Sequence, residues 1–281
     1  MRKIDELING IPQRTLFHYT SASGLLGILK EGRIWASSAY HLNDTGEYRY
    51  AFNLIADLLQ ARIRFEHGPL NEQYGRLLTD LATISTTMQA YVASFSEEGD
   101  LLSQWLSYPQ APNGYAIGLS PPHFIAARED GFTLMPCVYD PAKQNELANA
   151  VIEVLLEAIG GSVTSEQSEE FVSKALTAAA AIKHSGFKHE AEWRLVKTVP
   201  IGYGASKNVE FRQGRNGIVP YVEAQLTLIE GRFRPAAIHI GPNEDMASAK
   251  IALDTLLDSR GWNGLLAPKV EVERSKTPYR P

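Results

Sequence analysis

The sequence predicts an α+β protein in which a mixed, mostly antiparallel central sheet is flanked by helices. Strand signals, which are short runs rich in β-branched and aromatic residues, recur from one end of the 281-residue chain to the other. The helical stretches between them have irregular lengths, unlike the regular alternation of a doubly wound sheet. Hydrophobic residues make up 44% of the chain, which is enough to fill a core.

The first half of the chain is predicted to mix strands with helices. A strand at 15–21 leads into a helix that ends at Gly32, a residue typical of helix C-termini. Asp100 is expected to cap a short helix at 101–107. The other strands expected here are 33–39, 91–95, 115–119 and 132–139, and the other helices are 47–65 and 71–89.

In the second half, two amphipathic helices are expected at 145–159 and 165–182. They are interpreted as a helical insertion over 143–183 within a single domain spanning 1–281. The later strands expected are 191–199, 218–223, 236–240 and 270–274, with a helix at 246–259.

Charge and cysteine content narrow the function classes. A net charge of -5 disfavours broad binding to nucleic-acid phosphates. The lone Cys137 cannot form an intramolecular disulfide and is interpreted as a small buried hydrophobe. No signal peptide or long apolar run is found, so we expect a cytoplasmic protein with no membrane contact. Trp35, Trp105 and Trp193 are expected in the core.

Several common catalytic motifs are missing from the sequence. It contains no GxxxxGK[ST], no GxGxxG after a strand, no HExxH and no GxSxG. It also lacks clustered cysteine and histidine residues, so no metal is predicted.

The first candidate segment is Leu16-Phe-His-Tyr-Thr-Ser. Side chains alternate along a strand, so Phe17 and Tyr19 share one face and are expected to pack on the core. His18 and Thr20 then point to the other face, into a cleft or towards the sheet edge. A buried, hydrogen-bonded His18 with no further role is the alternative.

The second candidate segment is His189-Glu-Ala-Glu-Trp-Arg-Leu-Val. In a strand, Trp193 would face the core while Glu190, Glu192 and Arg194 share the polar face. Two neighbouring carboxylates repel, which tends to raise the pKa of one of them, and Arg194 can neutralise the other. A solvated outer face of an edge strand explains the same pattern, and the two interpretations stay open.

Two further segments contribute polar candidates. Ser37 precedes Asn43 and Asp44, which are favoured turn and cap residues. Ser96 lies at a strand end, where ligands are often bound or a helix is capped.

Taken in order, six short motifs resemble the bacterial domain-of-unknown-function family 2971. They are Phe17-His-Tyr-Thr-Ser, Leu42-Asn-Asp with Glu47, Phe95-Ser with Trp105, Glu190-Ala-Glu-Trp-Arg, Ile240-Gly-Pro and Ser275-Lys-Thr-Pro-Tyr-Arg, so the resemblance runs over about 15–280. Members of that family occur among abortive-infection (phage-defence) proteins, which implies a defence setting and no established reaction.

The opening strand, the helix Leu-Leu-Gly-Ile-Leu-Lys-Glu-Gly and the next strand are also similar to the start of the ADP-ribosyltransferase fold. In that fold an opening histidine bonds the NAD ribose, which His18 matches. A later glutamate stabilises the positive ribose centre as nicotinamide leaves, a role that fits Glu190 or Glu192. The middle aromatic position is open between Tyr40, Tyr91 and Tyr115.

These resemblances imply NAD as a substrate, transferred to a protein or nucleic-acid acceptor or hydrolysed. The segments 15–21 and 191–199 each have one polar and one apolar face, so we expect one sheet to bring them close together. His18, Glu190 and Glu192 would then converge as the expected catalytic residues. The expected ligand-binding residues are Thr20, Ser37, Asn43, Asp44, Ser96, Arg194, Arg212 and Arg215.

Two other functions stay open. The first is a non-catalytic module that senses a ligand or binds a partner in a phage-defence system. The second is a nuclease in which Asp44, Glu47, Glu190 and Glu192 surround magnesium and His18 acts as the base.

Overall fold

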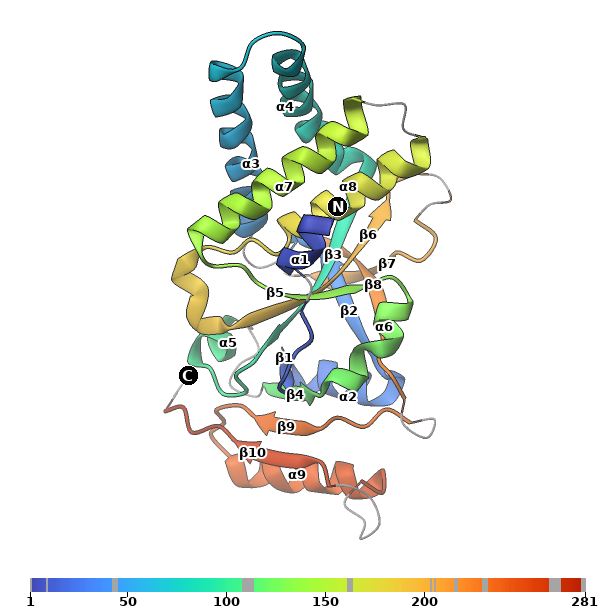
Figure 1. Cartoon of the computed structure of the whole chain (residues 1–281). Coiled ribbons are helices and arrows are strands. Elements are labelled where there is room, and N and C mark those ends of the chain that lie inside the picture. Colours follow the sequence, from blue (N-terminus) through green and yellow to red (C-terminus); the bar gives the residue numbers. More distant parts are fainter. Residues whose placement is uncertain are drawn as a thin grey trace.

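The described strands form one ten-stranded sheet, mixed and mostly antiparallel, which confirms the predicted fold class (Figure 1). The computed structural model describes residues 2–8, 10–41, 45–107, 114–160, 164–202, 204, 206–214, 217–228, 232–262 and 269–278. The strands are β1 (Leu16–Thr20), β2 (Arg33–Ser38), β3 (Met88–Ser96), β4 (Tyr115–Leu119), β5 (Thr133–Pro136), β6 (Glu192–Pro200), β7 (Glu210–Gly214), β8 (Gly217–Gln225), β9 (Ala237–Ile240) and β10 (Glu271–Arg274).

The strand order along the sheet is β10-β9-β4-β1-β3-β2-β8-β7, and β6 and β5 branch from β3. Only the β9–β10 pair is parallel among the described pairs. β3 is the central strand, because it pairs with β6 along its whole length and with β1 and β2 on its other side. The strand with His18 and the strand with Glu192 therefore flank the same strand, as their predicted proximity requires.

Helices cover both faces of this sheet. The helices are α1 (Arg2–Ile8), α2 (Ala22–Glu31), α3 (Thr45–Phe65), α4 (Pro69–Thr87), α5 (Leu102–Ser107), α6 (Ile125–Glu129), α7 (Pro141–Gly160), α8 (Ser165–Ala179) and α9 (Met246–Ser259). Figure 1 shows α3, α4, α7 and α8 gathered at one end of the molecule and α9 at the other. The segment 143–183, interpreted above as an insertion, contains most of α7 and all of α8.

Two apolar cores lie on opposite sides of β3 and β6. On the side that we call the α7 face, Val92 and Val196 join a core built with α3, α4, α7 and α8. On the other side, the α2 face, Phe95 and Leu195 join a core built with α2, α6 and α9. β6 is therefore an interior strand with both faces covered, and the predicted solvated face is wrong for it.

Among the described α-helices and strands, three were not predicted from the sequence: α1, α6 and β7. They contain seven, five and five residues, which offer few positions at which a hydrophobic period could show. β5 is also shorter than the predicted strand at 132–139, and it ends at a proline.

The tryptophan predictions hold for two of three residues. Trp105 and Trp193 are 2% and 7% exposed. Trp35 is 50% exposed, so its predicted place in the core is wrong. Its ring lies on the surface of β2 against Tyr221 of β8, with 4.6 Å between ring centroids.

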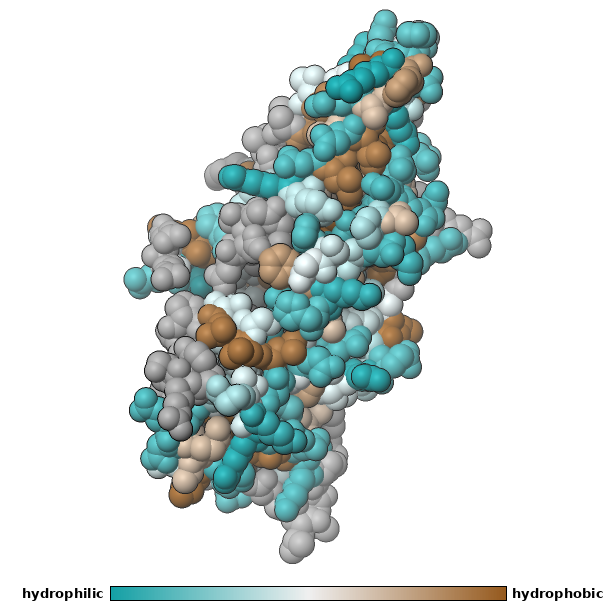
Figure 2. All heavy atoms as spheres, turned by 90° about the vertical axis from the view of Figure 1, so that its left-hand side faces the viewer, coloured by the Kyte–Doolittle hydropathy of each residue, from teal (hydrophilic) through white to brown (hydrophobic). Residues whose placement is uncertain are grey.

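The surface in Figure 2 is largely hydrophilic, with apolar atoms gathered near its upper end and again lower down, at the level of α5 in Figure 1. Leu102 and Leu106 of α5 are exposed. No helix in the described part of the chain has the length and apolar character to cross a membrane.

Candidate functional site

Four charged side chains form a closed cluster between β6 and the segment that follows α8. Lys183 donates to Glu190 at 2.6 Å and also to Glu192, and Arg194 Nε donates to Glu192 Oε1 at 2.7 Å. Their side chains are between 4% and 10% exposed. Two cations balance two carboxylates, so the cluster is neutral and almost sealed from solvent.

The surroundings of Glu192 hold it in the charged state. Burial alone would raise its pKa, but Arg194 and Lys183 lower the pKa of Glu192 to about 2. Its backbone N–H donates to the hydroxyl of Tyr139 at 2.9 Å, and burial raises the pKa of that tyrosine. Glu192 is thus an ionised acceptor, with both carboxylate oxygens engaged by protein cations.

The predicted strand face that carries both glutamates is wrong in one respect. Glu190 lies in a 3-10 helix, η3 (Ser185–Glu190), and not in β6. Ala191 follows with φ 42°, a left-handed conformation rare for a residue with a Cβ. This turn brings Glu190 back over β6, so both carboxylates reach Lys183.

His18 and Glu192 lie on opposite faces of the sheet, although their strands flank the same neighbour. Phe17 pairs with Ser96 and Ser96 pairs with Glu192, so these three side chains share the α7 face. His18 is the next residue and points to the α2 face, where its ring lies 5.5 Å from that of Phe95. The predicted convergence of His18 with the glutamates is therefore wrong.

His18 is hydrogen-bonded within the fold, and Thr20 is packed against a neighbouring helix. His18 Nδ1 donates to the backbone oxygen of Ser94 at 3.0 Å, and burial lowers the pKa of His18 despite this bond. Thr20 packs against the start of α2, with its Oγ1 only 2.0 Å from where a Cβ at residue 24 would lie. Gly24 leaves the room that this packing needs.

The other predicted ligand-binding residues separate into different places. Ser96 donates to the backbone oxygen of Glu190 at 2.7 Å, beside the charge cluster. Arg212 donates to Ser37 at 3.0 Å, so this pair does come together, on the β2–β8–β7 part of the sheet. Asn43, Asp44 and Arg215 lie outside the described residues, and so does the side chain of Glu47.

Asp100 joins α5 to the end of the chain. It accepts from Trp105 Nε1 at 2.8 Å, from Ser275 Oγ at 2.5 Å and from the backbone N–H of Lys276 at 2.7 Å. Burial alone would raise the pKa of Asp100, but these hydrogen bonds lower it. Asp100 was predicted to cap a helix; in the structure its carboxylate holds 275–277, and we call this set of hydrogen bonds the clamp.

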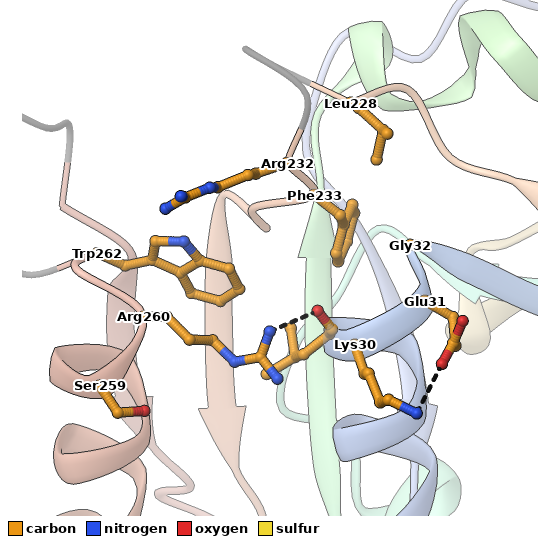
Figure 3. A pocket seen from close by; sticks show the side chains of 10 residues that line it. Lys30, Glu31, Gly32, Leu228, Arg232, Phe233, Ser259, Arg260 and Trp262 are labelled. Carbon is orange, nitrogen blue, oxygen red and sulfur yellow. Dashed lines mark hydrogen bonds and ion pairs between the residues drawn. The ribbon is translucent and has the colours of Figure 1, made fainter.

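A pocket of about 350 Å³ lies where the C-terminal ends of α2 and α9 meet the segment before β9 (Figure 3). Trp262 and Phe233 present aromatic rings to it, and both are largely buried. Its cations are Lys30, Arg232 and Arg260, and Glu31, bonded to Lys30 at 3.0 Å, is the carboxylate in its lining. The pocket therefore combines aromatic walls with a surplus of positive charge.

Arg260 is the most constrained residue of this pocket. Its guanidinium lies 5.3 Å from the centre of the Trp262 ring, and its Nη1 donates to the backbone oxygen of Leu29 at 2.8 Å. Its Nε is buried and finds no acceptor among the described residues. A buried guanidinium nitrogen without a partner carries a free-energy cost, which the other contacts of Arg260 offset.

The C-terminal end of α2 leaves room for Leu228 and Phe233, which form one wall of the pocket. Gly32 ends the helix at φ 66°, and a Cβ there would lie 3.1 Å from atoms of both Leu228 and Phe233. Gly32 was predicted to end a helix, whereas the pocket was not predicted. Arg260, Trp262 and Arg232 are far from residue 32 in the chain, and no spacing motif links them.

The described residues contain no group of three or more His, Cys, Asp or Glu side chains arranged to hold a metal ion. The magnesium set proposed from the sequence included Asp44 and Glu47, whose side chains are not described. Glu190 and Glu192 are occupied by Lys183 and Arg194.

The charge cluster lies in a segment that other proteins share. Residues 104–195 match the family described as "Protein of unknown function (DUF2971)". The expected resemblance to this family is confirmed over that segment, which is less than half of the chain. No curated protein and no solved structure matches.

The DUF2971 match runs from α5 into β6 and contains Lys183, Glu190, Glu192 and Arg194. It ends before the C-terminal residues of the pocket, and all of the pocket residues lie at 29–32 or 228–262. The match thus supports a shared framework around the charge cluster and assigns no reaction to it.

Proposed function

We propose that this protein is a ligand-sensing module that binds a small anion with an aromatic ring, of the nucleotide class, in the pocket between α2 and α9. The observation that carries the proposal is the surplus of cations around a pocket walled by Trp262, with the guanidinium of Arg260 held 5.3 Å from the centre of that ring. Arginine donates to phosphate oxygens in a fixed fork, and Arg232 in the lining is exposed.

The charge balance of the pocket supports an anionic ligand. The C-terminal ends of α2 and α9 are electronegative, and Lys30 and Arg260 offset that field. Arg232 is exposed and extends over the mouth of the pocket, as Figure 3 shows. It is the cation best placed to reach a phosphate that projects towards solvent.

The shape of the pocket supports one ring system. Ligand pockets span roughly 300–1,000 Å³, and a volume of about 350 Å³ is near the lower limit. Trp262 and Phe233 supply the faces on which a planar base can pack. A mononucleotide, or one end of a dinucleotide such as NAD, fits these dimensions.

The test is calorimetry of the purified chain with adenosine monophosphate, NAD, adenosine and inorganic phosphate. We expect the phosphorylated nucleosides to bind and adenosine to bind more weakly. Arg232→Gln should weaken binding about 10- to 100-fold, because a hydrogen bond to a charged group contributes about 1.5–3 kcal/mol. Lys188→Gln removes an equally exposed cation in η3 and should bind like wild type. Equal affinity in wild type and Arg232→Gln contradicts the proposal.

Turnover of NAD is a second candidate function, because NAD belongs to the ligand class that the pocket favours. The same samples should be assayed for nicotinamide release. If Glu192→Gln abolishes release in a folded protein while Arg232→Gln does not, catalysis proceeds at the charge cluster and the sensing proposal is wrong. The bacterial defence setting implied by the family resemblance is kept as a proposal in both cases.

A further inference from the structure

The outer edge of β7 is a strand edge open to a partner. β7 ends the strand order of the sheet, and no described strand pairs with its outer side. Phe211 in β7 is 65% exposed, and Ile218 across the hairpin in β8 is 72% exposed. With Arg212, Gln213, Gly214 and Gly217 they line a shallow hollow of about 540 Å³. Exposed apolar side chains on an unpaired edge are typical of a pairing surface.

The hairpin register fixes which backbone groups of β7 face outwards. Phe211 lies opposite Pro220, which has no N–H to donate, so these two residues form a non-hydrogen-bonded pair. Hydrogen-bonded and non-bonded pairs alternate along the ladder, so Arg212 and Glu210 bond to β8. Phe211 and Gln213 therefore direct their N–H and C=O groups away from β8.

The sequence of β7 is complementary to itself about Phe211. In an antiparallel pair of two β7 strands centred on that residue, Phe211 lies opposite Phe211 of the second copy, with both outward-facing amides bonded. Glu210 of each copy then lies opposite Arg212 of the other. A register centred on Arg212 would instead oppose two guanidinium groups, which disfavours it.

We propose that two copies of this chain associate through β7, as antiparallel strands centred on Phe211, to form one continuous sheet. The partner is a second copy because the two ends of Glu210-Phe211-Arg212 carry opposite charges that match only when the strand is reversed. β7 has no proline and no bulge to block such pairing. This inference is independent of the nucleotide pocket.

The test is sedimentation equilibrium of wild type and two charge variants over a wide concentration range. Wild type should reach the mass of a dimer at high concentration and dissociate on dilution. Glu210→Lys places an ammonium group opposite Arg212 of the other copy, and Arg212→Glu places two carboxylates opposite each other, so each variant alone should be monomeric. Lys188→Glu, a charge reversal at an exposed residue of η3, should dimerise like wild type.

Mixing the two monomeric variants decides the register. In a mixed pair, the introduced lysine of one variant meets the introduced glutamate of the other, and the retained Arg212 meets the retained Glu210, so association should return. A wild type that stays monomeric, single variants that still dimerise, or a mixture that stays monomeric would each overturn the proposal.

If Arg212→Glu does not fold because it loses its bond to Ser37, Phe211→Pro serves instead: it removes an outward N–H and leaves the β7–β8 ladder intact. A dimer of that variant also overturns the proposal.

Discussion

Lys183 donates to Glu190 at 2.6 Å, and this bond ties the segment after α8 to the turn before β6. Lys183 also donates to Glu192, so one ammonium group holds two carboxylates in a nearly sealed space. The cluster connects the helices of the α7 face to the sheet. A substitution that removes one of its charges leaves an opposite charge buried without a partner, which destabilises the folded protein.

Lys183→Met should therefore destabilise the protein strongly. It leaves two buried carboxylates with Arg194 as the remaining cation of the cluster, and breaking a buried ion pair typically costs about 3–5 kcal/mol. Chemical denaturation measures the free energy of unfolding. The double variant Lys183→Met with Glu190→Gln removes one unbalanced charge and should recover part of the loss. A single variant as stable as wild type would show that the cluster does not contribute as described.

Acid should weaken the fold through Glu192. Its folded pKa of about 2 lies below the reference value of 4.5, so the unfolded chain binds the proton first as pH falls. The stabilisation is present above pH 4.5 and is lost as pH falls towards 2, by an amount on the order of 3 kcal/mol. Unfolding free energies measured across this window should show the decrease. In Glu192→Gln the decrease should be smaller.

We expect the buried His18 to give the free energy of unfolding a second pH dependence, nearer to neutral pH. Burial lowers its folded pKa below 6.5, so the folded state favours the neutral ring. The unfolded chain gains the proton first, and stability should fall as pH drops below 6.5. His18→Asn keeps a side-chain N–H for Ser94 and should remove this component, whereas His189→Asn, at an exposed position, should not. Identical pH profiles for wild type and His18→Asn would refute the prediction.

Trp193 and Trp35 form a matched pair for a burial test. Trp193 is 7% exposed and its Nε1 donates to Glu97 at 2.8 Å, so Trp193→Ala should cost about 3–5 kcal/mol. Trp35 is 50% exposed and stacks on Tyr221, so Trp35→Ala should cost less than about 1.5 kcal/mol. Thermal unfolding of both variants is the measurement. A larger loss for Trp35→Ala would mean that the two environments are misassigned.

Asp100→Asn should loosen the C-terminal segment with little effect elsewhere. The amide keeps one acceptor oxygen but places an NH₂ group where Asp100 accepts either Ser275 and Trp105 or Lys276. Losing such a bond to a charged acceptor costs about 1.5–3 kcal/mol. In either orientation a bond to 275–277 is lost, so hydrogen exchange of the amides in this segment should accelerate, while exchange in β3 stays slow. Unchanged exchange across 275–277 would argue against the clamp.

Local structure could be predicted well from the sequence because side-chain periodicity is a local property. β4 at Tyr115–Leu119 and α9 at Met246–Ser259 have the predicted bounds, and the alternation of Glu192, Trp193 and Arg194 between two faces is as expected. The proximity of β1 and β6 was also predicted, from their matching polar and apolar faces. These features depend on a few neighbouring residues, which fix the helix or strand period.

The tertiary structure decided what covers each face, and with it the chemistry of the polar residues. Glu192 and Arg194 look identical in sequence whether they face water or a helix, and only the packing of α7 and α8 makes them a buried ion cluster. Lys183 was missed because one of its partners, Glu190, is brought to it by the turn at Ala191, whose left-handed backbone was not predicted. Arg260 and Trp262 meet Gly32 across more than 200 residues. Period and composition determine which elements form, whereas a site depends on contacts between elements distant in the chain, which are set by the packing of the whole fold.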